Sequence, residues 1–131
     1  MGSNQLSSAR AEYPAWFGGY GLAAESAPWG GLLVVARGEL DVAAVPELRR
    51  LLAPAASLGT SRILLDLSEV TFIDSLSLAA IVAAKRRLGD EGRLAVVADH
   101  HYVLLIFEAG GLDSVVEVFR TRDEAEAYLL G

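Results

Sequence analysis

The most informative segment of the chain occupies residues 66–78 and reads Asp-Leu-Ser-Glu-Val-Thr-Phe-Ile-Asp-Ser-Leu-Ser-Leu. Its first half belongs to an apolar run that predicts a buried strand over residues 62–67, after which residues 70–73 continue the chain toward Asp74. A helix is predicted next over residues 75–88, and Gly89 ends it after three basic residues that complement its negative end. A buried strand therefore delivers hydroxyl groups to the start of a helix.

Strands and helices alternate on both sides of this segment. Residues 19–26 and 32–36 predict two strands joined by a turn rich in proline and glycine at 27–31. Residues 38–41 are expected to end the second strand and to open an amphipathic helix that tails off near residues 57–59. The remaining expected elements are a strand over 93–98, a helix over 101–109, a strand over 114–119, and a helix over 121–130 that starts with a capping box of Thr121 and Glu124.

These elements predict an α/β fold. The sheet is expected to be mixed and mostly parallel, with about five strands that start as a hairpin-like pair, and with about four helices packed on it. We expect a single domain over residues 13–131, preceded by a disordered tail at 1–12 that is rich in Ser, Asn and Ala.

Composition narrows the classes of function. Of the 131 residues, 53% are hydrophobic and 21% are charged, which suits a folded core, and the lack of cysteine excludes disulfides and thiolate metal sites. The net charge of -6 disfavours direct binding to nucleic acid. No apolar run approaches the roughly 20 residues that span a bilayer, and residues 1–10 do not read as a secretory signal. The expected location is the cytoplasm, without membrane insertion, and the expected partner is another protein.

The helix start at Asp74 and Ser75 is the candidate site. Unpaired N–H groups and the positive end of the helix dipole favour a phosphate there, so Ser75 is a candidate phosphoacceptor. The simpler interpretation is that Ser75 or Asp74 only caps the helix, which is the commonest task of these residue types. Ser77 adds a second hydroxyl, and the first two helical turns are apolar nearly all round. One side of them must pack on the sheet, and the other is either covered or offered to a partner.

Four short motifs resemble the STAS-domain anti-sigma factor antagonists. They are Gly-Glu-Leu-Asp at 38–41, Leu-Asp-Leu-Ser at 65–68, Phe-Ile-Asp-Ser at 72–75, and Ile-Phe-Glu-Ala-Gly-Gly-Leu at 106–112. Each motif alone is weak, but in this order they are specific, and the resemblance covers about residues 31–130.

Within this family the pattern is aspartate, phosphorylated serine, serine or threonine, glycine and leucine. The resemblance therefore places the phosphoacceptor on Ser75, preceded by Asp74. Leu76 departs from the pattern because it stands where a second hydroxyl is usual, and Ser77 departs from it because glycine is usual there.

The resemblance implies a function in partner switching. The unphosphorylated domain is expected to bind an anti-sigma factor that is also a serine kinase, and to be released when Ser75 is phosphorylated. ATP belongs to that kinase, so no cofactor and no catalytic residue are expected in this chain. The predicted partner-binding residues are Glu39, Asp41, Asp74, Ser75, Leu76, Ser77 and Leu78.

Other interpretations remain open at this point. The main alternative is a STAS domain that is not phosphorylated and serves as a scaffold or subunit of a signalling or transporter complex. Residues 13–29 are rich in aromatic side chains, which could form a contact between two copies of the chain in a homodimer. A response-regulator receiver is disfavoured because Ala98-Asp99 and Arg120 replace its hydroxyl and lysine. A serine hydrolase is disfavoured because Ser75 lacks flanking glycines, and His100 and His101 are expected to be solvated or to cap a helix rather than to bind a metal.

Overall fold

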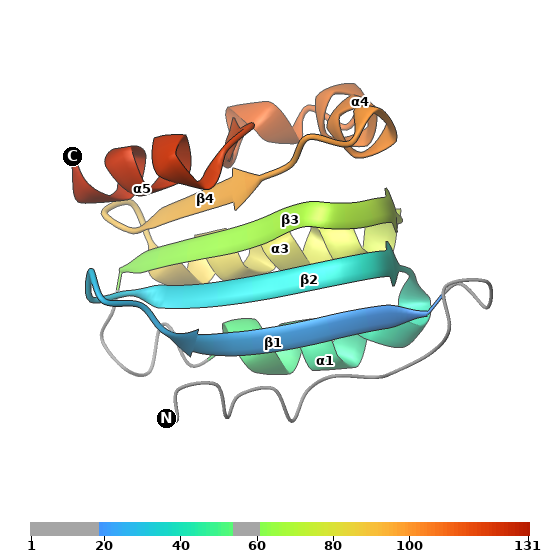
Figure 1. Ribbon diagram of the computed structural model, residues 1–131, viewed down its shortest axis with the longest axis horizontal. Coiled ribbons are helices and arrows are strands. Elements are labelled where there is room, and N and C mark those ends of the chain that lie inside the picture. The colour runs from blue at the N-terminus through green and yellow to red at the C-terminus, as the bar shows by residue number, and fades with distance from the viewer. Residues whose placement is uncertain (1–18, 54–60) are drawn as a thin grey trace.

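The computed structural model describes residues 19–53 and 61–131, and these residues build a five-stranded sheet (Figure 1). The strands lie in sequence order, and β1 pairs antiparallel with β2, while every later neighbour is parallel. This arrangement confirms the predicted mixed, mostly parallel sheet with a hairpin-like start. The strands are β1 Tyr20–Ser26, β2 Leu32–Leu40, β3 Arg62–Ile73, β4 Arg93–Val97 and β5 Glu117–Phe119.

Helices connect the parallel strands, as parallel pairing requires a crossover. The described part of the chain holds four α-helices and two short 3-10 helices. Figure 1 shows α1 and α3 together on the far side of the sheet. The helices are η3 Val42–Ala44, α1 Val45–Leu52, α3 Ser75–Leu88, α4 His101–Ala109, η4 Leu112–Ser114 and α5 Arg122–Leu130.

Two hydrophobic cores lie on opposite faces of the sheet, because successive strand residues point to opposite sides. The larger core joins the strands to buried residues of α1, α3 and α4, such as Leu48, Ile81 and Phe107. The smaller core includes alternate strand residues and is closed by Ala125 and Leu129 of α5. The sheet is therefore buried on both faces over its central strands, which explains the near-continuous apolar run in β3.

The second strand is longer than expected. It was predicted to end at residue 36, but β2 continues to Leu40, and its pairing with β3 shifts register near Gly38. Gly38 has a φ of +84°, and a Cβ there would lie 2.3 Å from the Gly19 carbonyl oxygen. The glycine therefore makes an irregularity within the strand rather than ending it.

The last strand is shorter than expected. It was predicted over residues 114–119, but η4 takes up residues 112–114 and β5 begins only at Glu117. Gly111, with a φ of +70°, turns the chain, and the hydroxyl of Ser114 donates to its carbonyl at 2.8 Å. These local hydrogen bonds compete successfully with strand pairing.

Two of the predictions fall on residues outside the described ranges. They are the disordered tail at 1–12 and the C-terminal end, near 57–59, of the helix that follows the second strand. Of the aromatic segment, only residues 19–29 are described.

Candidate functional site

The candidate site lies at the end of the sheet where β2 and β3 finish. The two strands pair in parallel up to Leu40 and Ile73, which lie opposite each other. The next residues along each strand are Asp41 and Asp74, so the register brings both carboxylates to the same edge of the sheet. In α/β folds this carboxyl edge is where function usually resides.

One backbone carbonyl fastens the start of α3 to this edge. The Leu40 oxygen accepts a hydrogen bond from the Asp74 N–H at 3.1 Å and another from the Ser77 hydroxyl, also at 3.1 Å. Ser77 is fully buried, although its residue type is usually exposed. Its burial is tolerable because the hydroxyl is hydrogen-bonded, so the first turn of α3 is held rigidly on the end of β2.

Asp74 is the N-cap of α3, as one of the open interpretations expected. Its carboxylate oxygen Oδ1 accepts from the Ser77 N–H at 2.9 Å, and its backbone carbonyl accepts from the Leu78 N–H at 3.1 Å. Ser75 is therefore not the cap. Among the described residues, none accepts a hydrogen bond from the Ser75 or Leu76 amide.

The Ser75 hydroxyl is exposed at the first position of α3. The two adjacent amides and the positive end of the helix dipole provide donors and a favourable potential for an anion attached to it. The start of α3 is therefore able to stabilise a negative charge at this position.

Two exposed apolar side chains belong to the elements that begin at this edge, η3 and α3. Val42, the first residue of η3, is 61% exposed, and Leu76 is 48% exposed. The two elements η3 and α3 are in contact. Together these residues and the carboxylates of Asp41 and Asp74 form the site surface, an apolar patch beside acidic groups.

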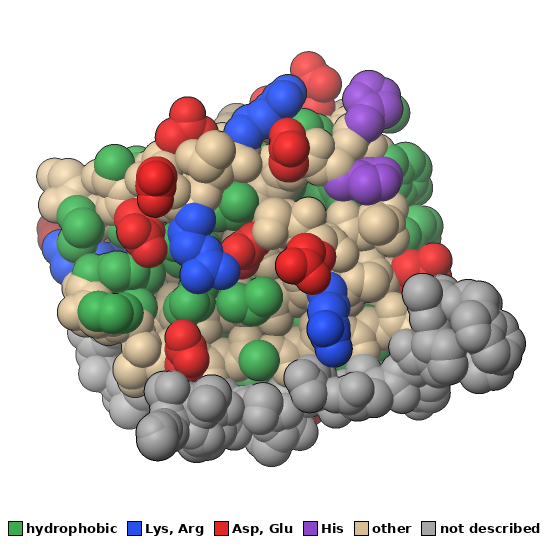
Figure 2. Space-filling view, in the orientation of Figure 1, with side chains coloured by type: hydrophobic (Ala, Val, Ile, Leu, Met, Phe, Trp, Pro, Cys, Tyr) green, Lys and Arg blue, Asp and Glu red, His purple; other side chains and the backbone are tan. Residues whose placement is uncertain are grey.

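An aromatic pair extends the same edge of the sheet. Phe72 of β3 stacks on Tyr102 of α4, with ring centroids 5.8 Å apart and an interplanar angle of 11°. His100 caps α4, since its Nδ1 accepts from the Tyr102 N–H at 3.2 Å, which agrees with the capping role expected for a histidine here. In Figure 2 the two histidines mark this end of the molecule, with hydrophobic side chains beside them. This pair could not be predicted from local sequence patterns, because its members are 30 positions apart.

Not all the predicted contact residues reach the surface. Glu39, Ser75 and Leu76 are exposed, and Asp41 and Asp74 are partly so. Asp41 caps η3, where its Oδ1 accepts from the Ala43 N–H at 3.0 Å.

The predicted contact role of Ser77 and Leu78 needs correction. Ser77 is fully buried, and Leu78 is only 8% exposed, because both face the sheet from the first turn of α3. Their side chains position the site and offer a partner almost no surface.

Within residues 19–53 and 61–131, no group of three or more His, Cys, Asp or Glu side chains is arranged to hold a metal ion. None of the helices formed by these residues is long and apolar enough to cross a membrane.

Known proteins share this fold. A crystal structure of an anti-sigma factor antagonist from Mycobacterium paratuberculosis superposes with a TM-score of 0.81 at 24% sequence identity, covering 92% of this chain and 100% of the other. SpoIIAA, an anti-sigma factor antagonist solved in its unphosphorylated form, gives a TM-score of 0.72 at 22% identity, covering 84% and 96% of the two chains. The phosphorylated form of SpoIIAA, from Bacillus, gives 0.64 at 22% identity, covering 82% and 97%.

Sequence comparisons point to the same group. The anti-sigma-B factor antagonist of Staphylococcus aureus is 33% identical over 82 residues, which are 62% of this chain and 76% of the relative. The corresponding protein of Staphylococcus epidermidis is 30% identical over the same length. The sequence model of the STAS domain matches residues 26–125. Since that match spans most of the chain and agrees with the fold, this protein belongs to the STAS domain family.

Proposed function

We propose that this protein is an anti-sigma factor antagonist whose unphosphorylated form binds an anti-sigma factor, and that phosphorylation of Ser75 weakens this binding. The observation that carries the proposal is the contrast between the two hydroxyls at the start of α3. Ser75 is exposed beside the apolar Leu76, whereas Ser77 is fully buried and bonded to Leu40. A kinase therefore has access to Ser75 alone of these two. The names of the relatives in Staphylococcus support the same role.

The physical basis of the switch is charge placed inside an apolar contact. A phosphoserine carries about two negative charges at neutral pH. On Ser75 these would stand between the exposed Leu76 and the capping carboxylate of Asp74. A partner that covers Val42 and Leu76 with apolar groups would have to desolvate the phosphate, and the neighbouring acids would not neutralise it. The neutral hydroxyl carries no such cost.

The partner follows from the same chemistry. The domain supplies an acceptor hydroxyl and no nucleotide-binding loop, so the phosphoryl group must come from a kinase that holds ATP. In our proposal this serine kinase is the anti-sigma factor itself, and the two proteins bind each other in the cytoplasm. The net charge of -6 opposes direct contact with DNA, so in this proposal the effect on transcription is indirect.

A second function is favoured by one observation. Leu76 occupies the place where the family pattern has a second hydroxyl, and its exposed side chain borders the route by which a kinase reaches Ser75. A domain that is never phosphorylated would use the same surface as a constant contact within a signalling or transporter complex.

The first experiment is intact-mass analysis with peptide mapping of the protein isolated from its native host, before and after phosphatase treatment. The proposal expects one removable phosphate on Ser75 in part of the molecules. If the protein carries no phosphate under any growth condition, the result would favour the second function, that of an unphosphorylated scaffold.

Binding measurements then test the switch. With the anti-sigma factor of the same host, Ser75→Ala should bind as the unmodified protein does, and Ser75→Asp should bind at least about tenfold more weakly. Ser61→Asp is the matched control, because Ser61 is exposed just before β3, while Ser75 follows the other end of that strand, roughly 35 Å away. Equal weakening by both Asp variants would reduce the effect to net charge and contradict a local switch.

A further inference from the structure

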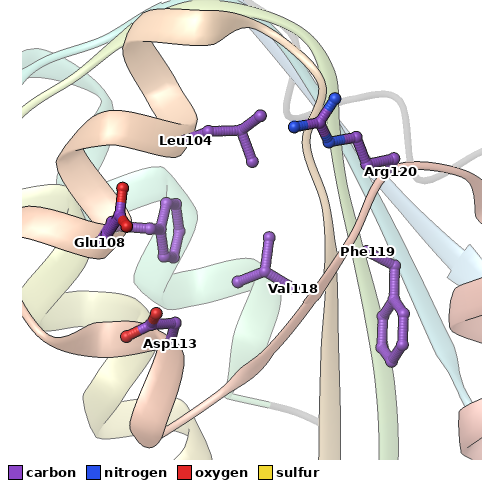
Figure 3. A pocket seen from close by; sticks show the side chains of 7 residues that line it. Leu104, Glu108, Asp113, Val118, Phe119 and Arg120 are labelled. Carbon is purple, nitrogen blue, oxygen red and sulfur yellow. The ribbon is translucent and has the colours of Figure 1, made fainter.

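A cleft of about 280 Å³ lies between α4 and β5 and shares no lining residue with the Ser75 site (Figure 3). Its floor is apolar. Phe107, which is 1% exposed, lines its buried part together with Leu104 and Val118. The volume lies near the lower limit for ligand sites and suits one or two side chains of a partner better than a large cofactor.

The rim of this cleft is charged, with opposite signs at its two ends. Glu108 in the last turn of α4 and Asp113 in η4 lie on one side, and Arg120 lies at the other end, directly after β5 (Figure 3). Arg120 approaches Asp99 only to 3.6 Å, and both side chains are more than 60% exposed. Such an exposed pair is weak, so the guanidinium can turn toward a ligand at little cost.

The backbone beside the cleft offers further hydrogen bonds, since β5 is an outer strand of the sheet. The Phe119 carbonyl accepts from the Ala98 N–H at 2.9 Å, so the polar backbone groups of Phe119 face β4. Successive residues of a strand direct these groups to opposite sides, and those of Val118 therefore face away from the sheet. Among the described residues, none bonds to them. An open strand edge of this kind is a template for another strand.

We propose that this edge and cleft together bind an extended peptide segment of a partner protein, which adds as a strand beside β5. The segment inserts an apolar side chain between Leu104 and Val118. It places a lysine or arginine at Glu108 and Asp113, and an aspartate or glutamate at Arg120. Strand addition with pockets for alternate side chains is an established mode of peptide recognition, and here the charges of the rim select the sequence.

Two short peptides serve as probes, both acetylated and amidated. Glu-Thr-Val-Thr-Lys presents its acid, valine and lysine on one face of a strand in the order that an antiparallel strand requires, and Lys-Thr-Val-Thr-Glu does so for a parallel one. Gln-Thr-Val-Thr-Gln is the uncharged control. Binding to the full chain is followed by NMR chemical-shift changes of the backbone amides.

We expect one of the two charged peptides to shift the amides of residues 104–120, with an affinity that falls as salt is added. The double variant Glu108→Gln, Asp113→Asn should weaken binding about tenfold. Val118→Pro should abolish it, because proline removes the outward N–H without removing a bond to β4, and edge strands tolerate such a proline. A melting curve checks the fold of this variant, and the double variant decides the matter if the proline variant does not fold.

Three results would overturn the proposal. The first is that neither charged peptide binds at concentrations of several millimolar. Dissociation constants of about that size are expected for so short a segment. The second is that the uncharged peptide binds as well as the charged ones. The third is that the shifts appear at the Ser75 site and leave residues 104–120 unchanged.

Discussion

The starts of α3 and α5 obey the same local rule, but different long-range contacts hold them. Each follows a strand, and each has a capping side chain that accepts from the third amide of the helix: Asp74 from Ser77 at 2.9 Å and Thr121 from Glu124 at 3.2 Å. The start of α3 is fastened by a buried neutral hydroxyl. That of α5 is fastened by an ion pair. Because the contact that holds the start of α3 is uncharged, a new charge on Ser75 does not compete with it. At the start of α5, Arg122 is already paired with the Asp66 carboxylate.

The anchor of α5 is the Asp66 carboxylate. It is 5% exposed, and its Oδ2 accepts from Arg122 Nε at 3.1 Å, while its Oδ1 accepts from the Ser68 N–H at 2.9 Å. Figure 1 shows α5 lying along β4, next to β3, which carries Asp66.

The largest effect in this comparison is expected for Asp66→Ala. Breaking a fully buried pair costs about 3–5 kcal/mol, but the Arg122 side chain is 43% exposed and can return to water, so we expect about 2 kcal/mol. Urea unfolding measures it. Arg122→Ala should cost a similar amount, since it leaves a buried carboxylate with fewer donors. A loss below about 0.5 kcal/mol for both variants would mean that the pair does not anchor α5.

The same carboxylate gives stability a dependence on pH. Burial raises the pKa of Asp66, but hydrogen bonds from Arg122 and Ser68 lower it by more, so the pKa lies below the ordinary 3.8. A group whose pKa is lowered by folding stabilises the fold above its unfolded pKa, and this contribution is lost as pH falls through the folded pKa. The free energy of unfolding of the protein relative to Asp66→Asn should therefore be constant above about pH 5 and shrink below about pH 4. A difference that persists to pH 2 would contradict the assignment.

The caps of α3 and α5 should contribute similar amounts to the free energy of unfolding. Asp74→Ala and Thr121→Ala each remove one bond to a third amide, and each should lower the free energy of unfolding by about 1 kcal/mol. Denaturant unfolding of the two variants side by side gives the comparison. If Asp74→Ala costs several times more than Thr121→Ala, the carboxylate holds the site by more than its cap.

The buried hydroxyl is expected to matter less than the cap. Ser77→Ala removes the bond to the Leu40 carbonyl but leaves that oxygen paired with the Asp74 N–H, so the loss should be about 0.5–1 kcal/mol. Ser77→Gly, which restores the usual residue of the family pattern, should cost about 1 kcal/mol more because glycine disfavours a helix. A stabilised glycine variant would show that Ser77 is strained in its place.

The smallest effect is expected at Ser75 itself. Its side chain is exposed and is not the cap, so Ser75→Ala should change the free energy of unfolding by less than about 0.5 kcal/mol. Thermal melts of this variant beside Asp74→Ala measure the contrast. A loss near 1 kcal/mol would revive the interpretation of Ser75 as a structural cap.

Most of the fold could be predicted because strong periodic patterns decide it. The apolar run of β3, the capping aspartate and Gly89 were enough to place the strand and helix that surround the site. The errors fell where glycine or short polar side chains allow two outcomes. Gly38 bends β2 without ending it, and the turn after Gly111 delays β5.

The candidate site was predicted less completely. Its centre, Asp74 and Ser75, could be found because a helix start follows local rules. The difference between Ser75 and Ser77 could not, since it depends on contact with Leu40, whose carbonyl lies 37 positions away in the chain. The Phe72–Tyr102 stack and the cleft at α4 and β5 were missed for the same reason.

The order of strands and helices, the cap that starts α5, and the presence of serines at the start of α3 could be read from the sequence alone. These features depend on neighbours within a few positions, and the side-chain periodicities of strand and helix encode them. The tertiary structure was needed to show which serine is exposed, which acids share an edge, and where an unpaired strand borders a cleft. Exposure and charge at a surface depend on residues that come together only when the sheet closes its two cores.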